Sequence, residues 1–163
     1  MNTTNYTYFQ YPFETFNPVQ TEVLTILEHD CNLVVSAPTS SGKTIAAELI
    51  AGKALASGKR IIYTSPLKAL AEQKLNEWND IQHPWFRFTK ILLTGDYKLT
   101  VARQEELSKA QIIISTYEMM SVQTRKALGE SNRWIEEVGC FIIDEGHFLS
   151  SDNRGDHLEN AVI

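Results

Sequence analysis

One segment of the chain combines the residue types that surround a phosphate chain. Residues 37–44 read Ala-Pro-Thr-Ser-Ser-Gly-Lys-Thr, which is the G-x-x-x-x-G-K-[ST] pattern with Ala37 in the first glycine position. Small residues let backbone N–H groups close around phosphate oxygens. Lys43 can reach the outer phosphates, and the hydroxyl of Thr44 can bind Mg²⁺. The residues expected to bind the nucleotide in this phosphate loop are Pro38, Thr39, Ser40, Ser41, Gly42, Lys43 and Thr44.

A second segment places two carboxylates at the end of an apolar run. Residues 141–145 read Phe-Ile-Ile-Asp-Glu, and ligands of open α/β sheets gather where such strands end. We expect Asp144 to hold Mg²⁺ through water, and Glu145 to orient and deprotonate the water that attacks the phosphate. On its own this acidic pair is equally typical of a strand that ends in solvated acids. The phosphate loop upstream favours the catalytic interpretation.

These two segments need strands and helices to position them, and the sequence supplies an alternation of both. The expected strands are residues 32–37, 60–65, 88–93, 111–115 and 139–144. The expected helices are residues 45–56, 66–80, 100–108 and 117–128, with Gly58 ending the first of them. Near-continuous Val/Ile runs are typical of strands covered on both faces, and the alternation predicts a parallel sheet with right-handed crossovers. The fold class is therefore α/β, a three-layer α/β/α sandwich.

Length and composition limit the number of domains and the class of protein. The 163 residues suit one domain, and no stretch approaches the ~18 apolar residues of a membrane helix. Residues 1–16 lack the basic start and apolar run of a signal peptide. A net charge of −5 argues against extensive contacts with nucleic-acid phosphates over the whole surface, although it permits a local basic track. Cys31 and Cys140 match no metal spacing, and we expect both to be reduced core residues of an intracellular, cytoplasmic or nuclear protein.

The phosphate loop together with Asp144-Glu145-Gly146-His147 resembles the DExH-type helicases of superfamily 2. Further segments resemble the Ski2-like group, which includes the Hel308 and Brr2-like helicases, in the right order: residues 16–20, 64–71, 94–97, 115–118, 154–155 and 158–159. The resemblance implies an N-terminal RecA-like P-loop NTPase domain that uses ATP and Mg²⁺. It divides the chain into an N-terminal extension, residues 1–16, and a helicase ATP-binding domain, residues 17–163.

The resemblance also implies roles for single residues. Gln20 is expected to hydrogen-bond the adenine edge and Phe16 to pack on its ring, with structural packing as the alternative for both. His147, which as a lone histidine would be unremarkable, is expected to couple the nucleotide site to a partner domain. Contacts to phosphates and sugars of a nucleic acid are expected from Pro66, Lys68, Gly95, Thr116 and Glu118. The alternatives there are a helix start for Pro66 and a solvated charge for Lys68.

Two departures from the family pattern stand out. Gly146 occupies a position where the family commonly carries a larger residue, which puts coupling through His147 in doubt. The sequence also stops at Ile163, before the Ser-Ala-Thr motif, the second RecA-like domain and its arginine finger. In the family the strand that leads to that motif lies between the strands of the phosphate loop and of the acidic pair. We therefore expect a gene fragment whose sheet lacks a central member.

The main hypothesis is the ATP-binding domain of an ATP-dependent helicase that acts on single-stranded DNA or RNA, with no membrane association. The second RecA-like domain is the implied protein partner, so the fragment alone should be nearly inactive. The alternatives are a non-catalytic nucleotide- or nucleic-acid-binding module and a translocase that does not unwind. Lys43, Thr44, Asp144 and Glu145 are all present, which favours a working ATPase.

Overall fold

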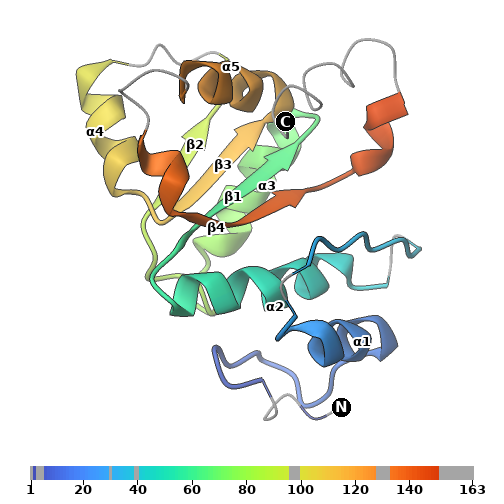
Figure 1. Cartoon of the computed structure of the whole chain (residues 1–163). Helices are drawn as coiled ribbons and strands as arrows, with labels where there is room; N and C mark the ends of the chain where they lie inside the picture. The colour runs from blue at the N-terminus through green and yellow to red at the C-terminus, as the bar shows by residue number, and fades with distance from the viewer. Residues whose placement is uncertain are drawn as a thin grey trace.

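The computed structural model describes residues 2, 6–29, 31–38, 41–95, 100–127 and 133–150 (Figure 1). The described residues form a four-stranded sheet in the order β2-β3-β1-β4, and all of its neighbouring strands are parallel. The strands are β1 Arg60–Ser65, β2 Lys90–Leu93, β3 Ile112–Thr116 and β4 Val138–Ile143. Four of the predicted strands are thus confirmed within two residues at each end. In the register of the sheet, Ile62 lies opposite Ile113 on one side and Phe141 on the other.

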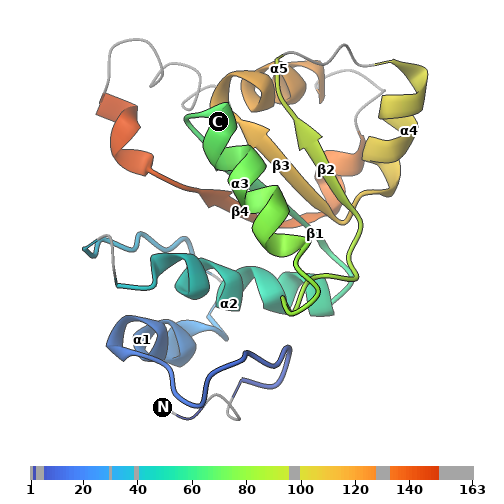
Figure 2. The same ribbon diagram turned by 180° about the vertical axis from the view of Figure 1, so that it is seen from behind.

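Helices cover both faces of this sheet, as the α/β/α prediction requires. They are α1 Pro18–Ile26, α2 Lys43–Ala56, α3 Lys68–Trp78, α4 Val101–Lys109 and α5 Tyr117–Ala127, with short 3-10 helices η2 Arg133–Glu137 and η3 Gly146–Ser150. Figure 2 shows α3 lying across one face, whereas α4 and α5 lie beyond the other. Gly58, at φ 75°, follows α2 as predicted. None of the described helices is long and apolar enough to span a bilayer.

The isoleucine runs of the strands supply both halves of the core. Ile61 and Tyr63 point to the face that packs against Leu55 of α2 and Trp78 of α3. The intervening Ile62 belongs to the cluster on the opposite face, with residues of α4, α5 and η2. Successive side chains of a strand point to opposite faces, so a continuous apolar run is what a sheet covered on both sides needs.

The predicted strand at residues 32–37 is wrong. Residues 31–38 have no regular structure, and the side chain of Val34 is 91% exposed. A strand forms only where a neighbour pairs with its N–H and C=O groups. Among the described residues, β4 pairs only with β1 and its other edge carries no strand. This free edge faces the position where the family resemblance expects a further strand, between β4 and residues 32–37.

The aromatic residues before α1 pack onto α2 (Figure 1). Tyr6, Tyr11 and Phe16 are each at most 9% exposed and surround Leu49. The hydroxyl of Tyr6 donates a hydrogen bond of 2.8 Å to the backbone oxygen of Leu49. Close approach is possible because α2 carries Gly52 here: a Cβ at that position would lie 2.2 Å from the Tyr6 hydroxyl.

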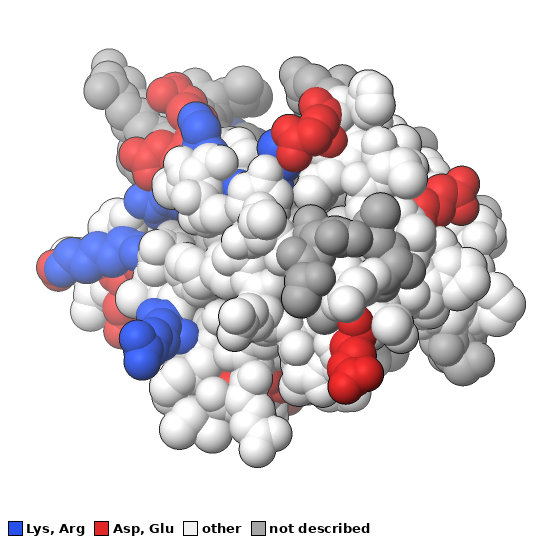
Figure 3. All heavy atoms as spheres, turned by 90° about the horizontal axis from the view of Figure 1, so that it is seen from below, with Lys and Arg blue, Asp and Glu red and all other residues white. Residues whose placement is uncertain are grey.

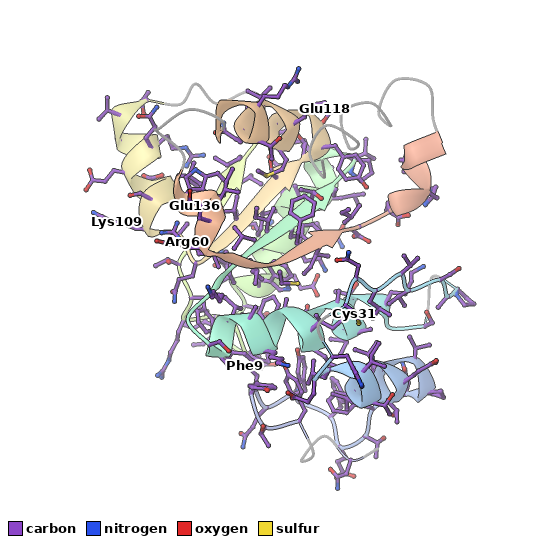
Figure 4. The ribbon with its side chains drawn as sticks, in the orientation of Figure 1. Phe9, Cys31, Arg60, Lys109, Glu118 and Glu136 are labelled. Carbon is purple, nitrogen blue, oxygen red and sulfur yellow. The ribbon has the colours of Figure 1, made fainter. Side chains whose placement is uncertain are left out.

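The two cysteines differ in their surroundings, and both are free. Cys140, in β4, is half-buried next to the core. Cys31 is exposed on the segment between α1 and α2 (Figure 4), so the prediction that it belongs to the core is wrong. It stands at the start of the run that forms no strand, and the absence of strand pairing there explains its exposure.

Candidate functional site

The start of α1 is built as a capping box that also reaches the phosphate loop. Asn17 is the N-cap; its Oδ1 accepts a hydrogen bond of 2.9 Å from the Gln20 backbone N–H, and Gln20 Oε1 accepts one of 3.0 Å from the Asn17 backbone N–H. Asn17 Nδ2 donates to the backbone oxygen of Ser41 at 2.8 Å. Gln20 Nε2 donates to the backbone oxygen of Gly42 at 3.4 Å. Both side chains therefore tie α1 to the loop.

Gly42 is required by this arrangement for two reasons. Its φ of 74° lies in the left-handed region, where residues with a Cβ are strained. A Cβ would also lie 2.5 Å from Gln20 Nε2 and 2.8 Å from Asn17 Nδ2. The glycine thus permits both the turn into α2 and the close approach of α1.

Lys43 and Thr44 open α2, where the N-terminal N–H groups of a helix favour an anion. Lys43 Nζ donates a hydrogen bond of 2.7 Å across the loop to the backbone oxygen of Ala37. The side chain of Thr44 is exposed, whereas Ser41 hydrogen-bonds through its backbone N–H to Pro38. Thr39 and Ser40, also predicted to bind the nucleotide, lie outside the described residues.

The two residues predicted to contact adenine are both largely buried. Phe16 is 5% exposed and packs edge-on against Tyr6 and Phe13. Gln20 is also 5% exposed, and both ends of its amide hydrogen-bond within the protein. Contact of either side chain with adenine therefore stays a prediction; the observed role of Gln20 is to join α1 to the phosphate loop.

Asp144 follows β4 and is held by groups from three places. Its Oδ1 accepts a hydrogen bond of 3.0 Å from the Glu145 backbone N–H. Its Oδ2 accepts one of 2.5 Å from the hydroxyl of Tyr63 in β1. Its backbone oxygen accepts one from the hydroxyl of Tyr117 at the start of α5. The carboxylate and the main chain of Asp144 are therefore fixed separately.

The two tyrosine hydroxyls remain protonated donors at neutral pH. Burial is the main cause that raises the pKa of Tyr63 far above its ordinary value of 10, and the negative charge of Asp144 adds to it. Burial and then Asp144 raise the pKa of Tyr117 in the same direction. Because an ionised phenol would repel the carboxylate, both groups can act here only as hydrogen-bond donors.

Glu145 has an unusual backbone conformation. Its φ of 56° makes it the one non-glycine residue with positive φ among those described. Such strain is found at functional sites, where the surrounding structure holds it in place. The side chain is exposed, and its Oε2 lies 3.1 Å from Nδ1 of His147. The strained turn leaves Glu145 exposed beside His147, the residue predicted to couple the nucleotide site to a partner domain.

The residues predicted to contact nucleic acid gather at the same edge of the sheet as Asp144. Because the four strands are parallel, their carboxyl ends lie together. Pro66 and Lys68 follow β1, Gly95 follows β2, and Thr116 and Glu118 stand at the junction of β3 and α5. Figure 4 shows Glu118 at the start of α5. Lys68 and Gly95 are exposed, Glu118 is half-buried, and Pro66 and Thr116 are buried.

Thr44 at the start of α2 and Asp144 after β4 are donors of the type that suits Mg²⁺ bound with a nucleotide. No group of three or more His, Cys, Asp or Glu side chains that could hold a metal exists among the described residues. Mg²⁺ in nucleotide sites takes one or two carboxylates and completes its shell with phosphates and water. The hydroxyl of Thr44 and the carboxylate of Asp144 are hard oxygen donors of the kind required. The residues therefore fit a metal that arrives with its nucleotide.

Three residues of this site have no role assigned from the sequence. Asn17 could have been identified, because Asn-Pro-Val-Gln is the pattern of a capping box with proline in the first turn. Tyr63 and Tyr117 gave no signal, because a tyrosine in an apolar run is usually a core residue. Their contact with Asp144 depends on strand order, which places β1 beside β4.

Known proteins resemble the chain over most of its length. The family model described as DEAD/DEAH box helicase matches residues 17–163. The ATP-dependent DNA helicase Hel308 of Pyrococcus abyssi is 41% identical over 154 residues, or 91% of this chain and 20% of that protein. The human U5 small nuclear ribonucleoprotein 200 kDa helicase is 36% identical over 148 residues, or 89% of this chain and 7% of that protein.

A solved structure gives the same result for the fold. The Mycobacterium smegmatis helicase Lhr, bound to single-stranded DNA and AMP-PNP, superposes with a TM-score of 0.68 at 27% identity. The match covers 90% of this chain and 20% of that one. The predicted RecA-like α/β fold is confirmed. The chain spans a fifth or less of the length of each of these proteins.

Proposed function

This chain belongs to the DEAD/DEAH box helicase family, and its relatives place it in the Ski2-like group of that family. We therefore propose that it is the ATP-binding domain of an ATP-dependent helicase. One observation carries the proposal: α2, which begins with Lys43 and Thr44, packs against β4, whose carboxyl end bears Asp144 and Glu145. The groups proposed to bind phosphate and to activate water are thus attached to adjacent elements. We take residues 17–163 as this domain and residues 1–16 as an extension that packs on it.

Binding of ATP replaces contacts that the loop makes internally. Lys43 exchanges the backbone oxygen of Ala37 for the β- and γ-phosphates, and the N–H groups at the start of α2 turn toward them. Thr44 and Asp144 would hold Mg²⁺, which would supply positive charge beside the phosphates. Glu145 orients the attacking water and takes its proton. A second RecA-like domain completes the site in this proposal, with His147 as the residue that contacts it.

Nucleic acid binds along the carboxyl edge of the sheet in this proposal. The net charge of −5 requires a localised contact rather than a broad basic surface. Figure 3 shows the molecule from below, on the side of the N-terminal segment and α1, where uncharged residues predominate and Lys and Arg stay toward one side. Pro66, Lys68, Gly95, Thr116 and Glu118 contact the backbone of single-stranded DNA or RNA. The site of action proposed is intracellular, cytoplasmic or nuclear.

The experiment measures binding of a fluorescent ATP analogue with Mg²⁺, and then ATP hydrolysis with and without single-stranded DNA or RNA. The wild-type chain should bind, and Lys43→Ala should not. Lys59→Ala, which removes an exposed charge just after α2, should bind normally. Hydrolysis should stay near the Lys43→Ala baseline, because an arginine from a second domain contributes roughly 10³–10⁵ in rate in other NTPases. Failure of the wild type to bind would reject the proposal.

A further inference from the structure

We propose that Tyr63 and Tyr117 are positioning residues for Asp144, which set how strongly this carboxylate holds Mg²⁺. The inference rests on the proposed function, because it assumes that Asp144 faces a metal brought by ATP. Neither tyrosine touches the nucleotide in this proposal. Each acts through Asp144, one on its carboxylate and the other on its backbone oxygen.

The side chain of Tyr63 is held in one orientation by its surroundings, and this fixes the position of its hydroxyl. The residue lies in β1, is 4% exposed, and packs edge-on against Trp78 with ring centroids 5.4 Å apart. The neighbouring backbone is fixed too, because Asp144 N–H donates to the backbone oxygen of Thr64 at 2.9 Å. The phenol therefore meets Asp144 Oδ2 at 2.5 Å from a rigid strand. Such a partner restricts the carboxylate to one rotamer.

Tyr117 fixes the same residue from a different element. It is fully buried at the first position of α5, and its hydroxyl donates to the backbone oxygen of Asp144. That bond holds the peptide unit between Asp144 and Glu145, directly before the left-handed turn at Glu145. Since Oδ1 already accepts from the Glu145 N–H, the carboxylate and the turn share one network.

Hydrogen-bond partners of this kind normally affect how strongly a metal is bound. Hydrogen-bond donors to a metal-holding carboxylate fix its orientation, and their loss typically costs 10- to 100-fold in metal affinity. Tyr63→Phe and Tyr117→Phe each remove one hydroxyl and keep the ring in the core. The expected result is a loss of about 10-fold in Mg²⁺ affinity for Tyr63→Phe, and a smaller loss for Tyr117→Phe, which leaves the carboxylate's own bonds intact.

The experiment titrates Mg²⁺ into each chain mixed with a fluorescent ATP analogue, and separately measures analogue binding in EDTA. Two matched controls exist in the N-terminal segment. Tyr11→Phe removes a buried phenol-to-carboxylate hydrogen bond, to Glu48, and Tyr6→Phe removes a phenol-to-backbone bond, to Leu49. Both should leave the Mg²⁺ dependence unchanged. All variants should bind the analogue equally in EDTA, which separates an effect on the metal from an effect on the nucleotide.

The outcomes separate a failure of the positioning role from a failure of the proposed ATP-binding function. Wild-type chain that fails to bind the analogue overturns both. Normal binding with an unchanged or strengthened Mg²⁺ affinity in both tyrosine variants overturns the positioning role alone. If melting shows that one variant is unfolded at the assay temperature, the other decides. In an Asp144→Asn background, Tyr63→Phe should cause no further loss of Mg²⁺ affinity; an equal additional loss would overturn the proposal, because the two effects would be independent.

Discussion

The indole N–H of Trp78 donates a hydrogen bond of 2.8 Å to Oε1 of Glu48, and both side chains are at most 1% exposed. Glu48 lies on α2 and Trp78 on α3, so the bond joins the two helices on one face of the sheet. The other oxygen of Glu48 accepts from the Tyr11 hydroxyl at 3.4 Å, and Nε2 of His83 lies 3.4 Å from it. A buried carboxylate depends on donors such as this indole and this phenol, because an unpaired carboxylate is costly.

Trp78→Phe should therefore destabilise the chain by about 3–5 kcal/mol, combining the lost donor with a cavity in the core. Urea denaturation followed by circular dichroism measures this. In a Glu48→Gln background the same substitution should cost clearly less, because no buried carboxylate remains to be satisfied. Equal losses in both backgrounds would show that packing alone matters at Trp78.

Gly52→Ala should destabilise the chain, although alanine favours a helix by about 1 kcal/mol over glycine. The reason is the Tyr6 hydroxyl, which would lie 2.2 Å from the new methyl group, and the Phe9 ring at 3.0 Å. Urea unfolding of Gly52→Ala alone and in a Tyr6→Phe background tests the contact. The loss should be smaller in the second case, and a stabilising effect of Gly52→Ala alone would contradict the close packing.

Arg60→Ala should lower stability by about 2–3 kcal/mol, because Arg60 closes the end of α4. Its guanidinium donates to the backbone oxygens of Leu107, at 3.0 Å, and Ser108. It also donates to the carboxylate of Glu137 at 2.7 Å. Figure 4 shows Arg60 in β1 on the same side as Lys109 of α4 and Glu136 of η2.

Thermal and urea denaturation of Arg60→Ala measures this loss, and two companion variants in the same assays separate the contacts of Arg60. Arg60→Lys should restore little, since an ammonium group cannot make the same set of bonds. Glu137→Gln should cost less than about 1 kcal/mol, because that carboxylate is 62% exposed. A larger effect from Glu137→Gln than from Arg60→Ala would refute the capping role.

The two thiols should react at very different rates. Burial raises the pKa of Cys140 to about 11, so little thiolate exists there at pH 8, whereas Cys31 is exposed. A thiol-specific chromogenic reagent at pH 8 should modify one thiol rapidly and the other only on addition of urea. Cys31→Ser should abolish the fast phase. Fast modification of Cys140 in folded Cys31→Ser would contradict the half-buried position in β4.

The same shift has a consequence for stability. The pKa of Cys140 rises from 9 to about 11 on folding, so folding favours the protonated thiol. This contribution is fully present below pH 9 and is lost as pH rises from 9 through 11. Cys140→Ala should therefore show a flatter decline of stability over this range than the wild type, which equilibrium unfolding at several pH values can measure.

The sequence predicted best those elements whose signal is local. Residues 60–65 form a strand at the predicted residues, and Gly58 ends α2 as expected, because an isoleucine run and a glycine after a helix each have one common explanation. Residues 32–37 have the same apolar pattern but form no strand. The pattern of apolar residues shows which segments are suited to a strand. Whether such a segment forms one depends on whether another strand lies beside it and pairs with its backbone groups.

Some residues of the candidate site could likewise be predicted from local sequence, whereas others depend on the tertiary structure. Lys43, Asp144 and their neighbours could be named because their chemistry is tied to motif and spacing. The hydroxyls of Tyr63 and Tyr117 reach Asp144 only because β1 lies between β3 and β4. The commitment of Gln20 to the backbone of Gly42 likewise depends on how α1 approaches the loop. Such contacts are set by tertiary structure, and no local signal in the sequence predicts them.

The unpaired edge of β4 bears on how this chain behaves in concentrated solution. Among the described residues, its outer row of N–H and C=O groups has no strand beside it. An open edge of this kind is a template on which another copy can add a strand, and therefore a starting point for aggregation.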